Sequence, residues 1–98
     1  MTNRLTIVES EDYTLDLEYS DEFFILHLLY FKPSVASVRE LKNKVIELKQ
    51  FSKVIGYSGV YTGVDPLDTK TPKLLRMLNA EKIGNSEGID VYQLKEED

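Results

Sequence analysis

Residues 23–33 read FFILHLLYFKP, and this stretch decides the expected fold. Its first nine residues are apolar on both alternating faces apart from His27, a pattern typical of a central strand that is covered on both sides. Pro33 ends the strand because proline has no N–H to donate to a sheet. The run is also too short to cross a bilayer, which takes about 20 apolar residues. We therefore predict a buried strand over residues 23–31.

The hydrophobic period changes directly after this strand. Apolar side chains now recur at the three- and four-residue spacing of a helix face, at Val38, Leu41, Val45 and Leu48. Ser37 followed by Glu40 matches a capping box, in which the glutamate reaches back to the serine amide. Residues 54–61, VIGYSGVY, then have the composition of a strand. A strand, a helix and a strand in succession predict a right-handed parallel crossover.

Two strands are predicted upstream and a helix with a hairpin downstream. Residues 5–8 are apolar enough for a short strand, and residues 13–19, YTLDLEY, alternate apolar and polar without a fault. Downstream, Thr71 and Pro72 mark a helix start, because proline suits the first helical position. Asn79 can adopt the left-handed conformation at that helix's end.

The closing hairpin is expected over residues 81–94, so the whole order is βββαβαββ. We predict an α/β fold with a mixed (α+β) sheet, an antiparallel meander plus one parallel crossover, as a single domain over residues 1–98. Its expected core is Leu15, Leu17, Ile25, Leu28, Leu29, Val38, Leu41, Val45, Val54, Leu74, Leu78 and Val91.

Composition excludes several kinds of site and partner. The 98 residues contain no cysteine, which rules out disulfides, thiolate metal sites and cysteine nucleophiles. Residues 1–4 lack the apolar stretch of a signal peptide, so we expect a cytoplasmic protein without a membrane partner. The net charge is −5, whereas nucleic-acid binders are usually basic, so we expect no free nucleic-acid partner. The acidic ends, residues 1–22 and 87–98, either solvate the surface or face a basic protein.

The element order resembles the C-terminal part of the GNAT-type N-acetyltransferases. Phe31-Lys32-Pro33 precedes the long helix, where family members often have a V-x-P step before a pyrophosphate loop. Residues 72–84, PKLLRMLNAEKIG, are similar to the family's leucine-rich stretch kLLkklGFekiG. The resemblance covers roughly residues 13–94 and extends to small, diverged acetyltransferase-like proteins of bacteriophages. It implies a minimal GNAT-like domain.

The resemblance also places a cofactor site, and the sequence departs from the family there. In the family, the loop [R/Q]-x-x-G-x-[G/A] lets backbone amides approach the pyrophosphate of acetyl-coenzyme A at a helix N-terminus. The matching residues 34–39, SVASVR, contain no glycine. If Ser37 and Glu40 form the capping box, the carboxylate would repel a second anion. The cofactor-binding candidates are therefore weak, namely Phe31, Val35, Ala36, Ser37 and Val38.

The expected general acid of the family is missing too. Its usual tyrosine matches Leu75 here, which cannot donate a proton. Tyr57 and Tyr61 are weak catalytic candidates, because a tyrosine on the preceding strand could serve as an acid; the alternative is that they pack at the sheet edge. His27, the single histidine, has no Cys or His partner for zinc, so we expect a core histidine with one hydrogen-bond partner and no metal site.

Two hypotheses follow. The first is an acetyltransferase-like domain that has lost catalysis, binds no cofactor and acts as a protein-interaction or inhibitor module, with another protein as its partner and a homodimer as a further expectation. The second is a minimal acetyl-coenzyme A-dependent N-acyltransferase with a diverged loop. It stays open because backbone amides do much of the cofactor binding in the family.

Overall fold

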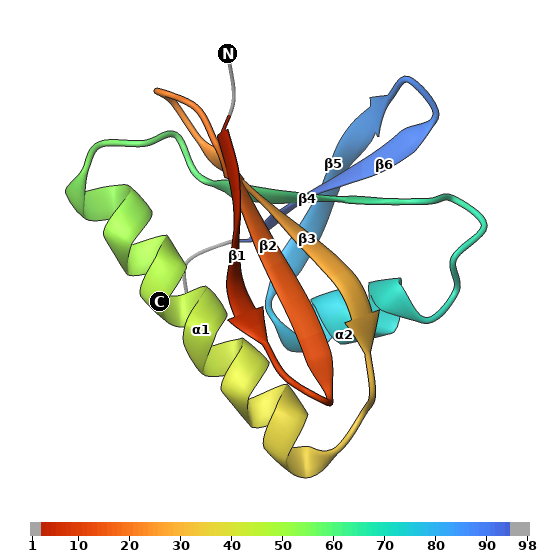
Figure 1. Ribbon diagram of the computed structural model, residues 1–98. Helices are drawn as coiled ribbons and strands as arrows, with labels where there is room; N and C mark the ends of the chain where they lie inside the picture. Colours follow the sequence, from red (N-terminus) through yellow and green to blue (C-terminus); the bar gives the residue numbers. More distant parts are fainter. Residues whose placement is uncertain (1–2, 95–98) are drawn as a thin grey trace.

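A six-stranded mixed sheet with two helices makes up the described part of the chain, residues 3–94 of a computed structural model (Figure 1). In chain order the elements are β1 (Asn3–Glu9), β2 (Tyr13–Tyr19), β3 (Phe24–Phe31), α1 (Val35–Val54), β4 (Val60–Val64), α2 (Thr71–Met77), β5 (Ala80–Ser86) and β6 (Ile89–Leu94). The order βββαβαββ is as predicted. Residues 1–2 and 95–98 of the predicted domain, which include the acidic residues 96–98, lie outside the described residues.

The sheet runs in the order β1-β2-β3-β4-β6-β5. β1, β2 and β3 form the predicted antiparallel meander. β3 and β4 pair in parallel, while β4, β6 and β5 pair antiparallel. The predicted mixed sheet with one parallel crossover is therefore confirmed. In this crossover, α1 connects β3 to β4, which are neighbours in the middle of the sheet. The candidate site forms beside these two strands.

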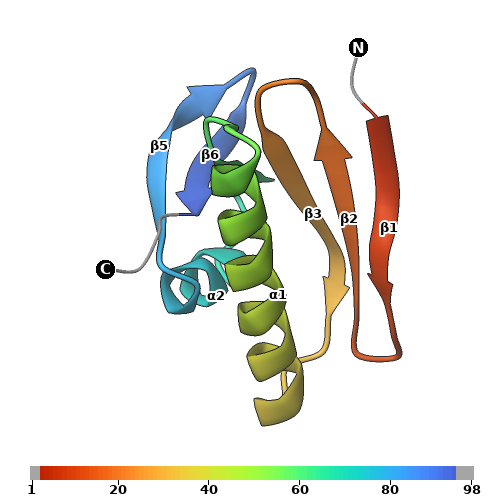
Figure 2. The ribbon, with the colours of Figure 1, turned by 90° about the vertical axis from the view of Figure 1, so that its left-hand side faces the viewer.

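Both helices pack against one face of the sheet (Figure 2). Alternate residues of β2 and β3 point toward α1, because side chains alternate between the faces of a strand. The buried core is Tyr13, Leu15, Leu17, Phe24, Leu26, Leu41, Val45, Val60, Val64, Leu75, Leu78 and Leu94. The helix face predicted around Leu41 and Val45 is confirmed, since these side chains are 2% and 1% exposed.

The start of α1 differs from the prediction. Ser34, not Ser37, is the N-cap, and its side chain accepts a hydrogen bond from the Ser37 amide. The Ser37 hydroxyl in turn accepts from the Ser34 amide, so the capping box is built from two serines. Glu40 lies in the second turn, beyond the reach of the cap. The serine at the third helical position replaces the expected glutamate because a short hydroxyl also reaches the cap amide, at 2.9 Å.

The end of α1 also differs. Residues 54–61 were predicted as a strand, but α1 continues to Val54 and β4 begins only at Val60. The connection contains Gly56 at φ 80°, a left-handed conformation that glycine adopts without steric cost. Val54 was predicted in the core and is 82% exposed. It occupies the last turn of the helix rather than the centre of a strand.

The prediction that β3 is covered on both faces is wrong. Neither described helix covers the outer face of the sheet. Ile25 and His27 point outward while Phe24, Leu26 and Leu28 point toward the helices. Leu29, a predicted core residue, lies at the irregularity in the β2–β3 register and is 55% exposed. The remaining predicted core members Ile25, Leu28, Val38, Leu74 and Val91 are half-buried, whereas Leu78 is buried.

The C-terminal elements follow the prediction closely. Pro72 lies in the first turn of α2, and Asn79 takes the expected left-handed conformation at φ 60° directly after that helix. β5 and β6 form the closing hairpin. Neither helix within residues 3–94 is long and apolar enough to cross a membrane.

Candidate functional site

β3 and β4 diverge halfway along the sheet. Their parallel pairing covers three residues of each strand, ending at Leu26 and Thr62. The Thr62 hydroxyl donates to the Leu26 carbonyl at 2.8 Å and so closes the ladder. Beyond this point β3 runs on to Phe31, and α2 occupies the angle between the separating strands (Figure 1).

The divergence leaves a free strand edge inside the sheet. The Phe24 amide donates to the Gly59 carbonyl, so Phe24 and Leu26 direct their backbone groups toward β4. Backbone direction alternates along a strand, so the N–H and C=O of Leu28 point the same way, where β4 has already turned aside. An extended ligand that carries amide groups could pair with this edge as a strand would.

A cavity of about 500 Å³ opens at the same place. Its walls come from the end of β3, the first turns of α1 and the start of α2, and they include Leu28, Phe31, Val38, Thr71 and Leu74. An adjoining apolar groove of about 480 Å³ shares Pro33, Val38 and Met77 with it and continues across the N-terminus of α1. The combined space is large enough for a small-molecule ligand.

The N-terminus of α1 closes one side of this space. Within the described chain, its first turn contains no acidic side chain, so the positive end of the helix dipole is not neutralised from within. The amides of Val35 and Ala36 precede the first intrahelical bond, which runs from the Val38 amide to the Ser34 carbonyl. Since Glu40 lies in the second turn, the expected repulsion of an anion at the cap by that carboxylate is not present.

Asp68 is the acidic group in the cavity wall, and it is occupied by hydrogen bonds. Its carboxylate accepts from the Thr71 hydroxyl and from the amides of Lys70 and Thr71. These bonds, the Thr71 hydroxyl first, lower the pKa of Asp68 below its usual value. Asp68 therefore holds the turn that leads into α2. Lys70, also in the wall, places a positive charge beside it.

Three of the five cofactor candidates predicted from the sequence line this space. Phe31 and Val38 line the cavity, Val35 and Val38 line the groove, and Ser37 is buried beneath the cap. Ala36 is exposed in the first turn of α1. The end of β3 and the start of α1 therefore border the cavity and the groove.

The two tyrosine candidates lie elsewhere. Tyr57 is in the loop before β4, and its ring packs tilted against Phe24 near the start of β3, with 4.9 Å between the ring centroids. It lines a separate hollow of about 200 Å³. Tyr61 is on β4 and meets Phe23 edge to face at 6.0 Å. Neither contributes to the wall of the 500 Å³ cavity, and Leu75 is 5% exposed in the core.

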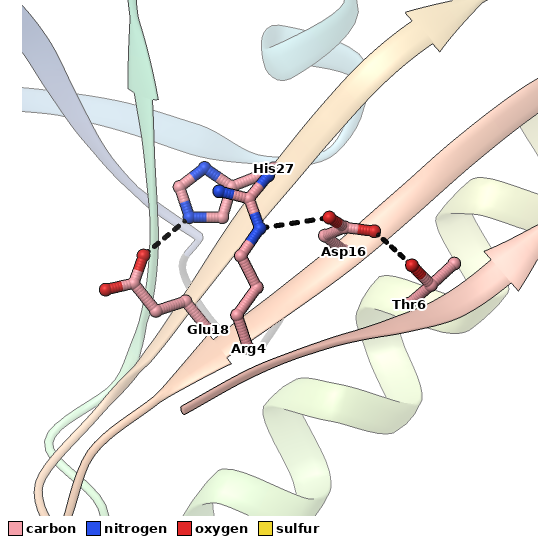
Figure 3. A network of polar contacts seen from close by, with 5 residues as sticks. All are labelled: Arg4, Thr6, Asp16, Glu18 and His27. Atoms are coloured by element: carbon pink, nitrogen blue, oxygen red, sulfur yellow. Dashed lines mark hydrogen bonds and ion pairs between the residues drawn. The ribbon is translucent and has the colours of Figure 1, made fainter. Parts of the chain in front are cut away.

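A polar network that sequence reasoning missed occupies the outer face of the sheet (Figure 3). On β2, Asp16 accepts from Arg4 Nε at 2.9 Å and from the Thr6 hydroxyl at 2.7 Å. The Thr6 hydroxyl, and after it the Arg4 guanidinium, lower the pKa of Asp16. Glu18 Oε1 lies 2.8 Å from His27 Nε2.

His27 was expected in the core with one hydrogen-bond partner. The partner is present, but the side chain is 30% exposed on the uncovered face. The perfect alternation of residues 13–19 could have shown that Asp16 and Glu18 share a face. The apolar neighbours of His27 concealed that it lies on this face too. No group of three or more His, Asp or Glu able to hold a metal ion is found within residues 3–94.

Comparison of the sequence with models of known protein families and with curated proteins finds no match. The structure is similar to the crystal structure of an aminoglycoside 6'-acetyltransferase type Ii, with a TM-score of 0.59 and 16% sequence identity. The similarity covers 94% of this chain, which spans 66% of the length of that one. The chain therefore has a GNAT-like α/β fold, as the order of its elements predicts.

Proposed function

We propose that this domain binds an acyl-coenzyme A-type ligand where β3 and β4 diverge, and acts as a minimal acetyl-coenzyme A-dependent N-acyltransferase. The single observation that carries the proposal is the cavity with its adjoining groove, which together extend from the free edge of β3 at Leu28 to the cap of α1. A pantetheine arm supplies amide groups for a strand edge, and a pyrophosphate suits the unneutralised start of a helix. The acetyltransferase fold of the similar structure agrees with this ligand class.

Each part of the site has a role in this proposal. The amides of Val35 and Ala36 would receive the pyrophosphate, with Lys70 adding a positive charge. The backbone of Leu28 would pair with the pantetheine arm, while Phe31 and Val38 would enclose its apolar portions. The family's tyrosine is replaced by buried Leu75, so a proton for the departing thiolate must come from another group or from water.

The test exploits opposite effects on folding and binding. Ala36→Glu adds a carboxylate to the first turn of α1, which stabilises a helix by about 0.3–1 kcal/mol. The same charge repels a phosphate, so we expect acetyl-coenzyme A to bind the variant at least tenfold more weakly in calorimetric titrations. Ala36→Gln is the matched control and should bind like the wild type. Equal affinities for all three proteins would show that the ligand does not use this helix.

A second variant tests the cavity directly. Val38→Trp fills the space shared by cavity and groove, and we expect it to abolish measurable binding. Val54→Trp places the same side chain on the same helix at an exposed position, so it should leave the affinity unchanged. Binding that survives Val38→Trp in a folded protein would place the ligand elsewhere.

A second candidate function is a protein-interaction or inhibitor module without catalysis. The observation that favours it is the uncovered outer face of the sheet, together with the 55% exposure of Leu29 at the irregular end of β3. Burying such apolar side chains favours association with another protein or a second copy. Absence of acetyl-coenzyme A binding by the folded wild type would favour this candidate over the first.

A further inference from the structure

We propose that the domain also takes its acyl group from the phosphopantetheine arm of an acidic carrier protein, which docks on a basic surface beside the cavity. This surface, the basic rim, consists of Arg39 and Lys42 on α1 and Lys73 on α2. The inference rests on the proposed binding of a pantetheine thioester at the edge of β3, because coenzyme A and a carrier protein bear the same arm.

The basic rim borders the apolar groove on both helices. Arg39 lines the groove directly. Lys42 lies three residues after Arg39 and four after the groove residue Val38, and such spacings make side chains neighbours on a helix. On α2, Lys73 has the same four-residue spacing to Met77, which also lines the groove. The three cations therefore belong to one surface, on the side of the sheet where both helices pack (Figure 2).

Neighbouring carboxylates do not offset the charges of the basic rim. No ion pair joins Arg39, Lys42 or Lys73 to a carboxylate within residues 3–94. Glu40 follows Arg39 but lies on the other flank of α1, toward β2, where burial and then the Glu40 carboxylate raise the pKa of Tyr13. The whole chain has a net charge of −5, so its composition does not account for this local surplus of positive charge.

The centre of this surface is apolar and exposed. Val35 and Met77 line the groove of about 480 Å³ and are 78% and 55% exposed. Protein interfaces combine an apolar centre with a polar rim. A phosphate group would satisfy the cations but leave both apolar side chains in water. A protein partner can bury Val35 and Met77 while its carboxylates meet the basic rim.

The cap of α1 connects this surface to the arm. In the proposed function, the phosphate end of the arm lies at the amides of Val35 and Ala36, and the arm then runs to the edge of β3 at Leu28. On a carrier protein this phosphate is esterified to a side chain of the protein itself, so the surface of the partner begins at the cap. The groove and the basic rim lie at the same place, and their positive charge complements an acidic partner.

The transfer keeps the chemistry of the proposed function. The amine nitrogen of the acceptor forms a bond to the thioester carbonyl carbon, and the bond from that carbon to the sulfur of the arm breaks. The nitrogen loses one proton and the thiolate takes one up. The products are an amide and a carrier protein whose arm ends in a free thiol.

Calorimetric titration at physiological salt tests the docking surface with two ligands. One is the acidic acyl carrier protein of bacterial fatty-acid synthesis with an acetylated arm, and the other is acetyl-coenzyme A. Because an exposed ion pair changes affinity by up to about fivefold, we expect the double variant Lys42→Gln/Lys73→Gln to bind the acetylated carrier protein about tenfold more weakly than the wild type. Its affinity for acetyl-coenzyme A should stay the same. Raising the salt should weaken binding of the carrier protein to the wild type more than to the double variant.

Two controls isolate the charge and the arm. Gln50→Glu changes the net charge by the same amount as Lys42→Gln, about 12 Å further along α1. Charges are screened beyond about 8 Å at physiological salt, so this variant should bind the carrier protein like the wild type. The carrier protein without its arm should bind the wild type more weakly than the acetylated form, because only the arm enters the cavity.

The two ligands separate failure of the docking surface from failure of the proposed function. Equal affinity of the wild type and the double variant for the acetylated carrier protein would overturn the docking surface. An equal loss of affinity for acetyl-coenzyme A would overturn it too, because the basic rim would then serve the phosphates of the coenzyme. A wild type that binds acetyl-coenzyme A but not the acetylated carrier protein would overturn this inference and leave the proposed function intact. A wild type that binds neither ligand would refute both.

Discussion

Ser37→Ala should destabilise this domain more than Ser34→Ala, although Ser34 is the N-cap of α1. Ser37 is 1% exposed, and its hydroxyl accepts from the Ser34 amide at 2.9 Å. It also approaches the Lys32 carbonyl at 2.9 Å as a donor, which ties α1 to the end of β3. The side chain thus serves both the cap and the connection that shapes the cavity.

The magnitudes follow from these bonds. Removing a cap hydroxyl such as that of Ser34 costs about 1 kcal/mol. Ser37→Ala removes two partners at once, and at about 1 kcal/mol for each hydrogen bond we expect about 2 kcal/mol. The double variant should lose less than the sum of the single changes, because the two hydroxyls also contact each other at 2.9 Å.

Urea unfolding followed by circular dichroism measures these differences. At a typical slope of about 2 kcal/mol/M, a loss of about 2 kcal/mol moves the midpoint by about 1 M. A loss below about 0.5 kcal/mol for Ser37→Ala, the range of an ordinary surface change, would refute the reasoning. So would a larger loss for Ser34→Ala than for Ser37→Ala.

Three further predictions concern stability. Leu41→Ala should cost about 2–5 kcal/mol because the side chain is 2% exposed in the core, while Lys42→Ala on the exposed side of α1 should cost less than about 0.5 kcal/mol in the same urea experiment. Asn79→Ala should be about 1 kcal/mol less stable than Asn79→Gly, since φ is 60° there; equal thermal midpoints for the two variants would contradict this. The pKa of Asp16 is lowered in the folded protein. Its contribution to stability is therefore complete above about pH 4, the pKa of an unfolded aspartate, and is lost as the pH falls through the folded value. The stability of Asp16→Asn should depend less steeply on pH below about 4 than that of the wild type, and an unchanged acid-unfolding curve would count against the network.

The sequence predicted the elements whose side chains alternate or recur regularly. Residues 13–19 show a period of two, and Leu41 and Val45 mark a helix face. The predictions of β2 and of the buried side of α1 were therefore correct. The order of the elements, and with it the fold, followed from these segments. Each of these segments places its apolar side chains on one face, so its pattern is compatible with one type of secondary structure.

The errors occurred where the sequence pattern allows more than one structure. Both faces of β3 are apolar, so periodicity could not show that the outer face of this strand is uncovered. Val54 begins an apolar run that resembles a strand, but it lies in the last turn of α1, where it is 82% exposed. A serine three residues after Ser34 gives a weaker cap signal than the glutamate after Ser37, which explains the misplaced helix start.

The candidate site was predictable in part. The resemblance indicated the end of β3 and the start of α1, and Phe31 and Val38 do line the cavity. The contact between Glu18 and His27 depends on the register of two strands, nine residues apart in sequence. Local sequence patterns do not fix that register.

The most direct measurement is a titration of ¹⁵N-labelled protein with acetyl-coenzyme A, followed through the backbone amide resonances. Binding where β3 and β4 diverge predicts saturable shifts at Leu28, Phe31, Ala36 and Thr71, with little change at Tyr57 in the separate hollow. The account would be contradicted by a spectrum that stays unchanged at millimolar ligand, or by shifts confined to the residues around Tyr57.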